Sequence, residues 1–457
     1  MDGDPAVEPE LDSLSLAFPL PYRVALIVVL AVWAWGVNLH YLDFIGIDVP
    51  ALIRYPGRPS AHHPSHHLST YRLATALSAL FAFSLLVFWA FTHGDSGRVL
   101  AWGWLPIAYL LALPVLLFLA PFFLRRFSHS GRSRLRSMLR RIAVGGLAET
   151  KDGKFGDILL ADVLTSYAKV LADFFVALCM FFRPDGRSAS ARPDRACGGS
   201  LAVPCVLALP YLIRFRQCLI EYVRVRRGRS GDASPSSSGW GGQHLANALK
   251  YATAFPVVIF SALQQRSAAT ADPSLSPPVV ASGYYRAWVV ACLVNSLYSF
   301  YWDVAKDWDL MLFEDVAAAA REGPARAMAG AEKPFGLRRR LHVGPAGLYY
   351  VVIAMDLALR CTWSLKLSPH LGRLADWEGS IFVIQVLEVF RRWVWIFFRV
   401  ETEWIRSTSP GAGGGGTGAL EAGGAGGDIM LPDFQYDNYS NHNSNYNAPA
   451  PGYHDDA

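Results

Sequence analysis

The stretch that decides the fold is residues 21–42, PYRVALIVVLAVWAWGVNLHYL, in which Arg23 is the only charged residue. An α-helix needs roughly 20 mostly apolar residues to cross a bilayer core about 30 Å thick. Similar blocks recur between segments rich in Arg, Gly, Pro and Ser. The nine candidate spans are 21–42, 71–92, 98–122, 156–182, 199–213, 244–263, 284–304, 344–366 and 378–400. The sequence therefore predicts an all-α, polytopic transmembrane helical bundle of about nine spans, within a range of eight to ten.

The composition of the 457 residues agrees with this fold class. Hydrophobic residues make up 52% of the chain and charged residues only 17%. Soluble domains usually carry about 25% charged residues, and disordered regulators are poor in apolar residues, so both classes are excluded. The fifth block is short and contains Pro204 and Pro210, which favours a broken or re-entrant helix there.

Charge in the loops predicts the orientation of the spans. The first 20 residues are acidic, unlike the positive start of a cleaved signal peptide, so the first block is expected to act as a signal anchor. Arginine-rich segments follow the third and fifth blocks and precede the eighth. The positive-inside rule places these segments in the cytosol, with a luminal N-terminus and a cytosolic C-terminus. A loop with Arg183, Arg187, Arg192 and Arg195 falls on the luminal side, against the rule.

Three segments are expected: a short acidic luminal N-terminus (1–20), a transmembrane domain (21–405) and a cytosolic tail (406–457). The tail is rich in Gly and Asn and has too little to bury for a packed domain, so it is predicted to be disordered. We attribute the formal net charge of +5 to basic loops that set the topology and attract anionic lipids. No nucleic acid is expected to bind. Six scattered cysteines without paired spacing suggest no disulfide framework.

Ionisable and polar side chains form seams inside the apolar blocks. Each ionisable group costs about 2.5 to 3.5 kcal/mol on insertion scales, and such groups usually face a bundle interior or a watery path. The seams are Asp162, Lys169 and Asp173 on one stripe of the fourth block; Asn247, Lys250 and Tyr251 in the sixth; Asn295, Ser299, Asp303 and Asp307 in the seventh; Asp356 and Arg360 in the eighth; and Glu388 with Arg391 and Arg392 in the ninth. One interpretation is a set of buried ion pairs that pin helices together. Because seams on five helices exceed what helix register needs, we predict a polar path through the bundle.

The basic residues of these seams indicate what the path conducts. Lys250, Arg360, Arg391 and Arg392 supply cationic groups from three blocks. Guanidinium groups match the oxygens of phosphate or carboxylate in paired hydrogen bonds, and Arg or Lys rings suit anion pores. The acidic residues Asp303, Asp307 and Glu388 would hold the cationic side chains in place while no transported anion is bound. The chemistry favours an oxyanion, and an aspartate-led path for protons or metal ions is the alternative.

Five ordered motifs carry a family resemblance. They are LPYLIRFRQCL at 209–219, HLANALKY at 244–251, YSFYWDVAKDW at 298–308, DLALRCTW at 356–363 and LEVFRRWVW at 387–395. These motifs resemble those of the EXS-domain membrane proteins, a family that includes eukaryotic phosphate exporters and the yeast ER-retention-defective branch of the Golgi. The resemblance implies a phosphate pathway lined by Lys250, Asp303, Asp307, Arg360, Arg391 and Arg392, the residues that the charge argument selects.

The same resemblance extends the set of pathway residues. It implies that Tyr251 lines the pathway and that Trp363 is a gate. Asn247, which shares a face with Lys250, and Glu388, which stands beside Arg391 and Arg392, are expected as supporting residues. Asp162 lies in LADVLTS at 160–166, similar to an exporter segment in which an asparagine stands where this chain has Thr165. Full-length exporters of the family carry an SPX sensor domain before their spans, and with roughly 20 residues before the first span here no such domain is expected.

Other patterns are set aside. His62, His63, His66 and His67 stand in a Pro-rich stretch without an acidic or Cys partner, so we expect no metal site. The glycines at 411–416 lack the strand and Lys-Ser/Thr of a phosphate-binding loop. No sequence motif of an enzyme is present. We therefore expect neither a cofactor nor catalysis.

The sequence predicts a multi-pass protein of the Golgi membrane, with the ER as an alternative, that returns inorganic phosphate from the lumen to the cytosol and so supports glycosylation and retention of resident proteins. Its expected partners are inorganic phosphate and membrane lipids, and a second copy of the chain is a candidate partner. Two alternatives stay open. One is a sorting factor that contacts Golgi recycling machinery and glycosyltransferases, and the other is a phosphate exporter of the plasma membrane.

Overall fold

The structure is a computed structural model that describes residues 11, 13–53, 66–119, 129–149, 152–183, 188–228, 241–270, 279–322, 333–367 and 378–408. Within these ranges every regular element is a helix, which confirms the all-α fold class. The tail from 409, with the glycines at 411–416, and residues His62 and His63 lie outside the described residues.

Each of the nine predicted blocks coincides with a described helix or with consecutive helices. The first half of the chain forms α1 (Ser13–Ala17), α2 (Leu20–Phe44), α3 (Val49–Leu52), α4 (His66–Thr92), α5 (Ser96–Ala101), α6 (Trp104–Pro114), η1 (Val115–Leu119), α7 (His129–Ala143), α8 (Lys154–Ser166), α9 (Ala168–Phe181) and α10 (Ala202–Gly228). The second half forms α11 (Gly242–Ala252), α12 (Ala254–Thr270), α13 (Val279–Trp302), η3 (Asp303–Asp307), α14 (Leu312–Glu322), α16 (Ala346–Arg360), η4 (Thr362–Leu367) and α18 (Glu378–Thr408). Because α18 continues to Thr408, residues 406–408 belong to this helix and not to the predicted tail.

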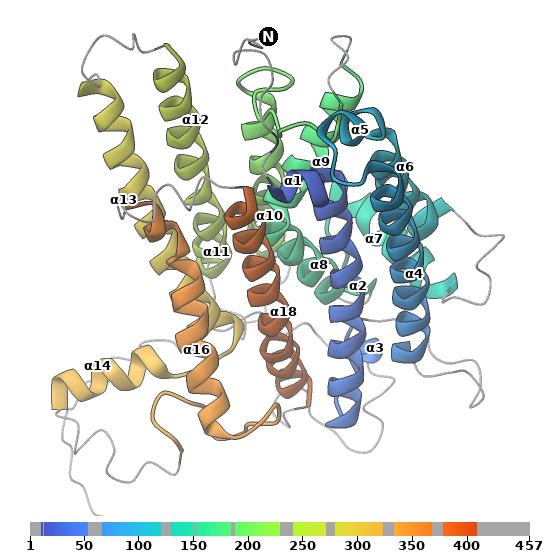
Figure 1. Ribbon diagram of the computed structural model, residues 1–457. Coiled ribbons are helices and arrows are strands. Elements are labelled where there is room, and N and C mark those ends of the chain that lie inside the picture. The colour runs from blue at the N-terminus through green and yellow to red at the C-terminus, as the bar shows by residue number, and fades with distance from the viewer. Residues whose placement is uncertain are drawn as a thin grey trace, which may run out of the picture.

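Five of the described helical segments are long and apolar enough to cross a membrane, and a sixth is added if α8 and α9 form one bent span. The predicted spans 284–304, 344–366 and 378–400 correspond to α13, α16 and α18, which are helical but did not meet the same criterion of length and composition. Figure 1 shows the long helices running side by side, with α7 and α14 at an angle to them. The number of nine spans therefore stays a prediction.

Two expectations for individual blocks are wrong. The fifth block is neither short nor broken, because α10 runs continuously from Ala202 to Gly228 with Pro210 inside it. Neighbouring helices can satisfy the backbone group that a membrane proline leaves free. The break lies instead in the fourth block, where α8 and α9 meet at an angle of 63°. This bend separates Asp162 from Asp173 and leaves Lys169 exposed, so these three residues do not form one stripe.

The core of the described residues contains two large apolar clusters, and α18 contributes side chains to both. One cluster packs residues such as Tyr22 of α2, Phe88 of α4 and Val176 of α9. The other packs Trp395 and Phe398 of α18 against residues of α2, α8, η3 and α16. The helix α18 contacts α2, α8 and α16, and in Figure 1 it stands among them. A polar side chain on its buried face therefore meets other helices rather than lipid.

A disulfide corrects the expectation from cysteine spacing. Cys179 at the end of α9 bonds to Cys197 in the segment before α10. The 18-residue separation of the two cysteines matches no recognisable disulfide motif. The pair meets only because the chain folds back over the end of α9. In the same segment Arg183 pairs with Asp194 at 2.9 Å and Arg195 pairs with Glu378 at 2.6 Å. Two of the arginines that oppose the positive-inside rule are thus neutralised by acidic partners.

Candidate functional site

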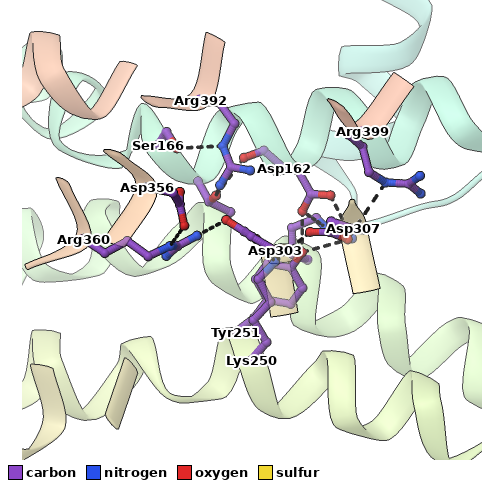
Figure 2. A network of polar contacts seen from close by, with 12 residues as sticks. Asp162, Ser166, Lys250, Tyr251, Asp303, Asp307, Asp356, Arg360, Arg392 and Arg399 are labelled. Atoms are coloured by element: carbon purple, nitrogen blue, oxygen red, sulfur yellow. Dashed lines mark hydrogen bonds and ion pairs between the residues drawn. The ribbon is translucent and has the colours of Figure 1, made fainter. Parts of the chain in front are cut away.

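Polar side chains from six helical elements meet inside the bundle, in an arrangement that we name the central cluster. Its basic members are Arg214, Lys250, Arg360, Arg391 and Arg392, and its acidic members are Asp162, Asp303, Asp307, Asp356 and Glu388. Figure 2 shows most of them converging from α8, α11, η3, α16 and α18. Five basic and five acidic groups are therefore balanced in formal charge.

Lys250 of α11 joins two aspartates of the chain segment that follows α13. Its Nζ lies 3.0 Å from Asp303 Oδ1 and 3.1 Å from Asp307 Oδ2. These aspartates open and close η3, a single π-helical turn. Such wide turns are rare and occur frequently at functional sites. Here the turn holds both carboxylates on the one ammonium group, which is only 5% exposed.

Arg360 and Arg391 share a second pair of carboxylates. Arg360 Nε donates to Asp356 Oδ2 at 3.0 Å within α16, and its Nη2 donates to Asp303. Arg391 of α18 donates to Asp356 Oδ1 at 2.9 Å and approaches Asp303 Oδ2 at 3.4 Å. It also holds Glu388, one turn earlier, at 2.6 Å. Both guanidinium groups are therefore held by two or more carboxylates.

Asp162 of α8 is bound by a residue that the sequence analysis did not include among the site residues. Arg214 of α10 donates from Nε to Asp162 Oδ1 at 2.7 Å and from Nη2 to Oδ2 at 3.3 Å. Tyr251 donates its hydroxyl to the same Asp162 Oδ1. The sequence placed Arg214 in a cytosolic loop because the fifth block was ended at 213, but it is 3% exposed inside α10. Its position in the motif at 209–219 was the available signal.

Arg392 differs from the other basic members of the cluster. Its Nε donates to Ser166 Oγ at 2.9 Å and its Nη2 approaches Thr165 Oγ1 at 3.5 Å. Its guanidinium carbon stacks 4.4 Å from the centre of the Trp395 ring. Within the described part of the chain Arg392 forms no ion pair with a carboxylate, although it is only 5% exposed. Figure 2 shows its guanidinium group beside Ser166, with a dashed line joining the two side chains.

Two buried donors at this point have no acceptor among the described residues. They are Arg392 Nη1 and Nε1 of Trp395, the ring on which Arg392 stacks. Buried polar groups in proteins are almost always hydrogen-bonded, so an orphaned donor requires an explanation such as a water or an ion. Donors that lack acceptors suit an anion. Ser166, Thr165 and Trp395 are thus site residues that the sequence analysis did not select.

The remaining predicted site residues lie at the periphery. Trp363, the expected gate, lies in η4 and donates from Nε1 to Ser296 Oγ at 2.9 Å. Ser296 in turn donates to the backbone carbonyl of Arg360 at 3.0 Å. The buried Asn247 Oδ1 accepts no hydrogen bond from a described residue, so this atom does not join Asn247 to the cluster. Arg399, one further residue that was missed, lies 3.9 Å from Asp307 and pairs with Glu403 at 3.1 Å.

Comparison with known proteins agrees with the motifs in this cluster. The model of the EXS family matches residues 18–405. Protein ERD1 homolog 1 of Schizosaccharomyces pombe is 29% identical over 394 residues, which cover 85% of this chain and 92% of the relative. Protein ERD1 of Kluyveromyces lactis is 30% identical over 331 residues, covering 72% of this chain and 76% of the relative. Solute carrier family 53 member 1 of Mus musculus is 30% identical over 271 residues, which cover 55% of this chain and 33% of the relative. Because the family match spans most of its 457 residues, this chain belongs to the EXS family, whose domain is a membrane domain.

Proposed function

We propose that the protein is a phosphate transporter or channel of the Golgi or ER membrane, which returns inorganic phosphate from the lumen to the cytosol. The observation that carries the proposal is Arg392, a buried guanidinium with hydroxyl partners and one donor without an acceptor. Similarity to a solute carrier supports transport rather than catalysis. The family resemblance of the motifs supports phosphate as the oxyanion.

The central cluster suggests how an anion would pass. Phosphate oxygens accept from Arg392 Nη1 first, since no other acceptor competes for it within the described chain. Guanidinium donors replace part of the hydration shell that the anion loses on entering the bundle. The neighbouring Arg391, Arg360 and Lys250 add positive potential, but their carboxylate partners reduce it. Binding then stays weak enough for release, which conduction requires.

The disulfide supports the proposed orientation. Disulfides persist in oxidising compartments such as the ER lumen and are rare in the cytosol. The Cys179–Cys197 bond lies between α9 and α10, in the segment that the charge pattern places in the lumen. Two independent arguments, one from arginine loops and one from cysteine chemistry, thus favour a luminal N-terminus and a cytosolic C-terminus.

The proposal is tested by flux of labelled inorganic phosphate into proteoliposomes that contain the purified full-length chain. Wild-type protein is expected to conduct phosphate above empty liposomes. The variant Arg392→Ala should reduce flux about tenfold or more, because a hydrogen bond to a charged group contributes about 1.5 to 3 kcal/mol.

A matched control removes the same side chain elsewhere. Arg140 is exposed on α7, and Arg140→Ala should leave flux unchanged. Thermal unfolding of each variant in detergent separates a lost pathway from a lost fold. Wild-type vesicles no more permeable to phosphate than empty ones, or a folded Arg392→Ala protein with full flux, would refute the proposal.

A further inference from the structure

A second group of charged residues lies at the end of the bundle that carries the disulfide. Glu378, the first residue of α18, accepts from Arg195 at 2.6 Å and 3.2 Å and from Arg23 of α2 at 2.9 Å. Arg195 also lies 3.8 Å from Asp173 of α9. Asp173 in turn accepts from Gln385 at 2.6 Å. We name Arg23, Asp173, Arg195, Glu378 and Gln385 the mouth cluster.

The mouth cluster and the central cluster lie along one face of α18. Glu378, Gln385, Glu388 and Arg392 are spaced by seven, three and four residues, a spacing that keeps side chains on one stripe of an α-helix. Glu388 pairs with Arg391, and Gln385 pairs with Asp173. On this face of α18 polar side chains therefore stand at its first residue and again from Gln385 to Arg392, with Ile381 and Phe382 on the turn between them.

Arg195 is the member of the mouth cluster that water reaches best. Its side chain is 33% exposed, compared with 2% for Arg23, 8% for Asp173 and 11% for Glu378. Arg195 does not belong to a helix of the bundle. It lies in the segment before α10, two residues from Cys197, whose disulfide to Cys179 ties this segment to the end of α9. The loop thus holds one guanidinium over the ends of α9 and α18.

We propose that Arg195 is the luminal entrance residue, an inference that rests on the proposed phosphate pathway. An incoming oxyanion first takes the place of a carboxylate as the partner of the Arg195 guanidinium group. A fixed positive group at the end of a polar path raises the local concentration of anions. Glu378 and Asp173 compete for Arg195, so the anion is passed on rather than trapped. The disulfide positions the loop for this exchange. This role is distinct from the interior cluster and concerns capture from the lumen.

The test measures how flux of labelled inorganic phosphate depends on its concentration on the luminal side of oriented proteoliposomes. Arg195→Ala should raise the half-saturating luminal concentration about tenfold, as expected for the loss of a charged hydrogen bond, while maximal flux is retained. Arg195→Lys keeps the charge and should raise it less. The double variant Cys179→Ser with Cys197→Ser should shift half-saturation in the same direction as Arg195→Ala.

Arg192 supplies the matched control, since it is exposed in the same loop three residues away, and Arg192→Ala should leave both parameters unchanged. A half-saturating concentration for Arg195→Ala equal to that of wild type would overturn the inference while leaving the proposed function standing. So would a loss of maximal flux with unchanged half-saturation, which marks a purely structural ion pair. Absence of flux in the wild-type protein itself would overturn the proposed function and this inference together.

Discussion

Arg392 of α18 donates to the hydroxyl of Ser166 at the end of α8, with Nε and Oγ 2.9 Å apart. Arg391, its neighbour in sequence, is instead held by Glu388 and Asp356. Two adjacent arginines in one motif therefore have different electrostatic environments. Arg391 is paired directly with carboxylates, whereas the hydrogen bonds of Arg392 within the described residues go to hydroxyl groups.

The hydroxyl partner of Arg392 gives the first prediction. Ser166→Ala removes the acceptor of Arg392 Nε, and an unpaired buried donor costs roughly 1 to 3 kcal/mol. We expect a destabilisation of this size in denaturant unfolding, together with altered phosphate flux. Ser78→Ala on α4 is the matched control, because it also removes a hydroxyl acceptor, that of Trp33 Nε1 at 2.9 Å. Both variants are expected to lose stability, so flux is the readout that separates them. Unchanged flux in Ser166→Ala, or altered flux in the Ser78→Ala control alone, would contradict a role for Ser166 in the pathway.

The Lys250 ammonium group gives a second prediction, on stability. Among the described residues, Lys250→Met leaves Asp307 with Arg399 as its one basic partner, at 3.9 Å, and an uncompensated buried charge typically costs about 3 to 5 kcal/mol. The double variant Lys250→Met with Asp307→Asn should recover part of this loss, because it removes the stranded carboxylate. Unfolding of the two single variants and the double variant measures the coupling, which for contacting residues is about 0.5 to 3 kcal/mol. Simple additivity of the single effects would count against the pairing.

The tryptophan of η4 gives a third prediction, on gating. Trp363 is tied through Ser296 to the backbone of Arg360, so its ring is positioned by the helix that carries a pathway cation. If Trp363 is the gate, Trp363→Ala should raise phosphate flux, and Ser296→Ala should raise it less because it frees the ring without removing it. Trp363→Phe keeps most of the bulk but also loses the hydrogen bond to Ser296, so it should raise flux about as much as Ser296→Ala and less than Trp363→Ala. A decrease of flux in folded Trp363→Ala protein would assign the ring to packing.

The disulfide gives a fourth prediction, on topology. In sealed microsomes a membrane-impermeant reductant should leave Cys179 and Cys197 oxidised, because the proposed orientation places their bond in the lumen. Detergent should expose the bond to the reductant and make two further thiols available to a maleimide reagent. The variant with both cysteines replaced by Ser supplies the baseline for the remaining thiols. Reduction in intact vesicles would reverse the proposed orientation.

The C-terminal segment gives a fifth prediction, which distinguishes transport from sorting. Removal of residues 409–457 deletes no member of the central cluster, so phosphate flux should be unchanged. A sorting factor that works through this segment would instead lose retention of resident proteins while transport persists. Flux in proteoliposomes and secretion of resident proteins from cells that express the shortened chain are the two measurements. Loss of flux on removal would show that the pathway needs this segment.

The helices and the charged residues within them could be predicted from the sequence. A bilayer fixes the length and composition of a spanning helix, because backbone groups must be satisfied within it. Each predicted apolar block therefore coincides, within the described residues, with a helix or with consecutive helices. The same constraint makes any ionisable group in a block conspicuous, which is how Lys250, Asp303, Arg360 and Arg391 were selected.

Other features depend on contacts between distant segments and could not be read from local patterns. The bend between α8 and α9, the disulfide of Cys179 and the length of α10 belong to this group. Arg214 was missed for the same reason, since its partner Asp162 is 52 residues away. Spacing along a chain reports which face a residue occupies but not what that face meets.

By itself, the sequence determined that this is an all-helical membrane protein of the EXS family with cations and carboxylates inside its helices. Only the tertiary structure decided which cation is paired with which acid. Successive residues on a helix point about 100° apart, so Arg391 and Arg392 face different neighbours. Asp356 of α16 meets one, and Ser166 of α8 meets the other.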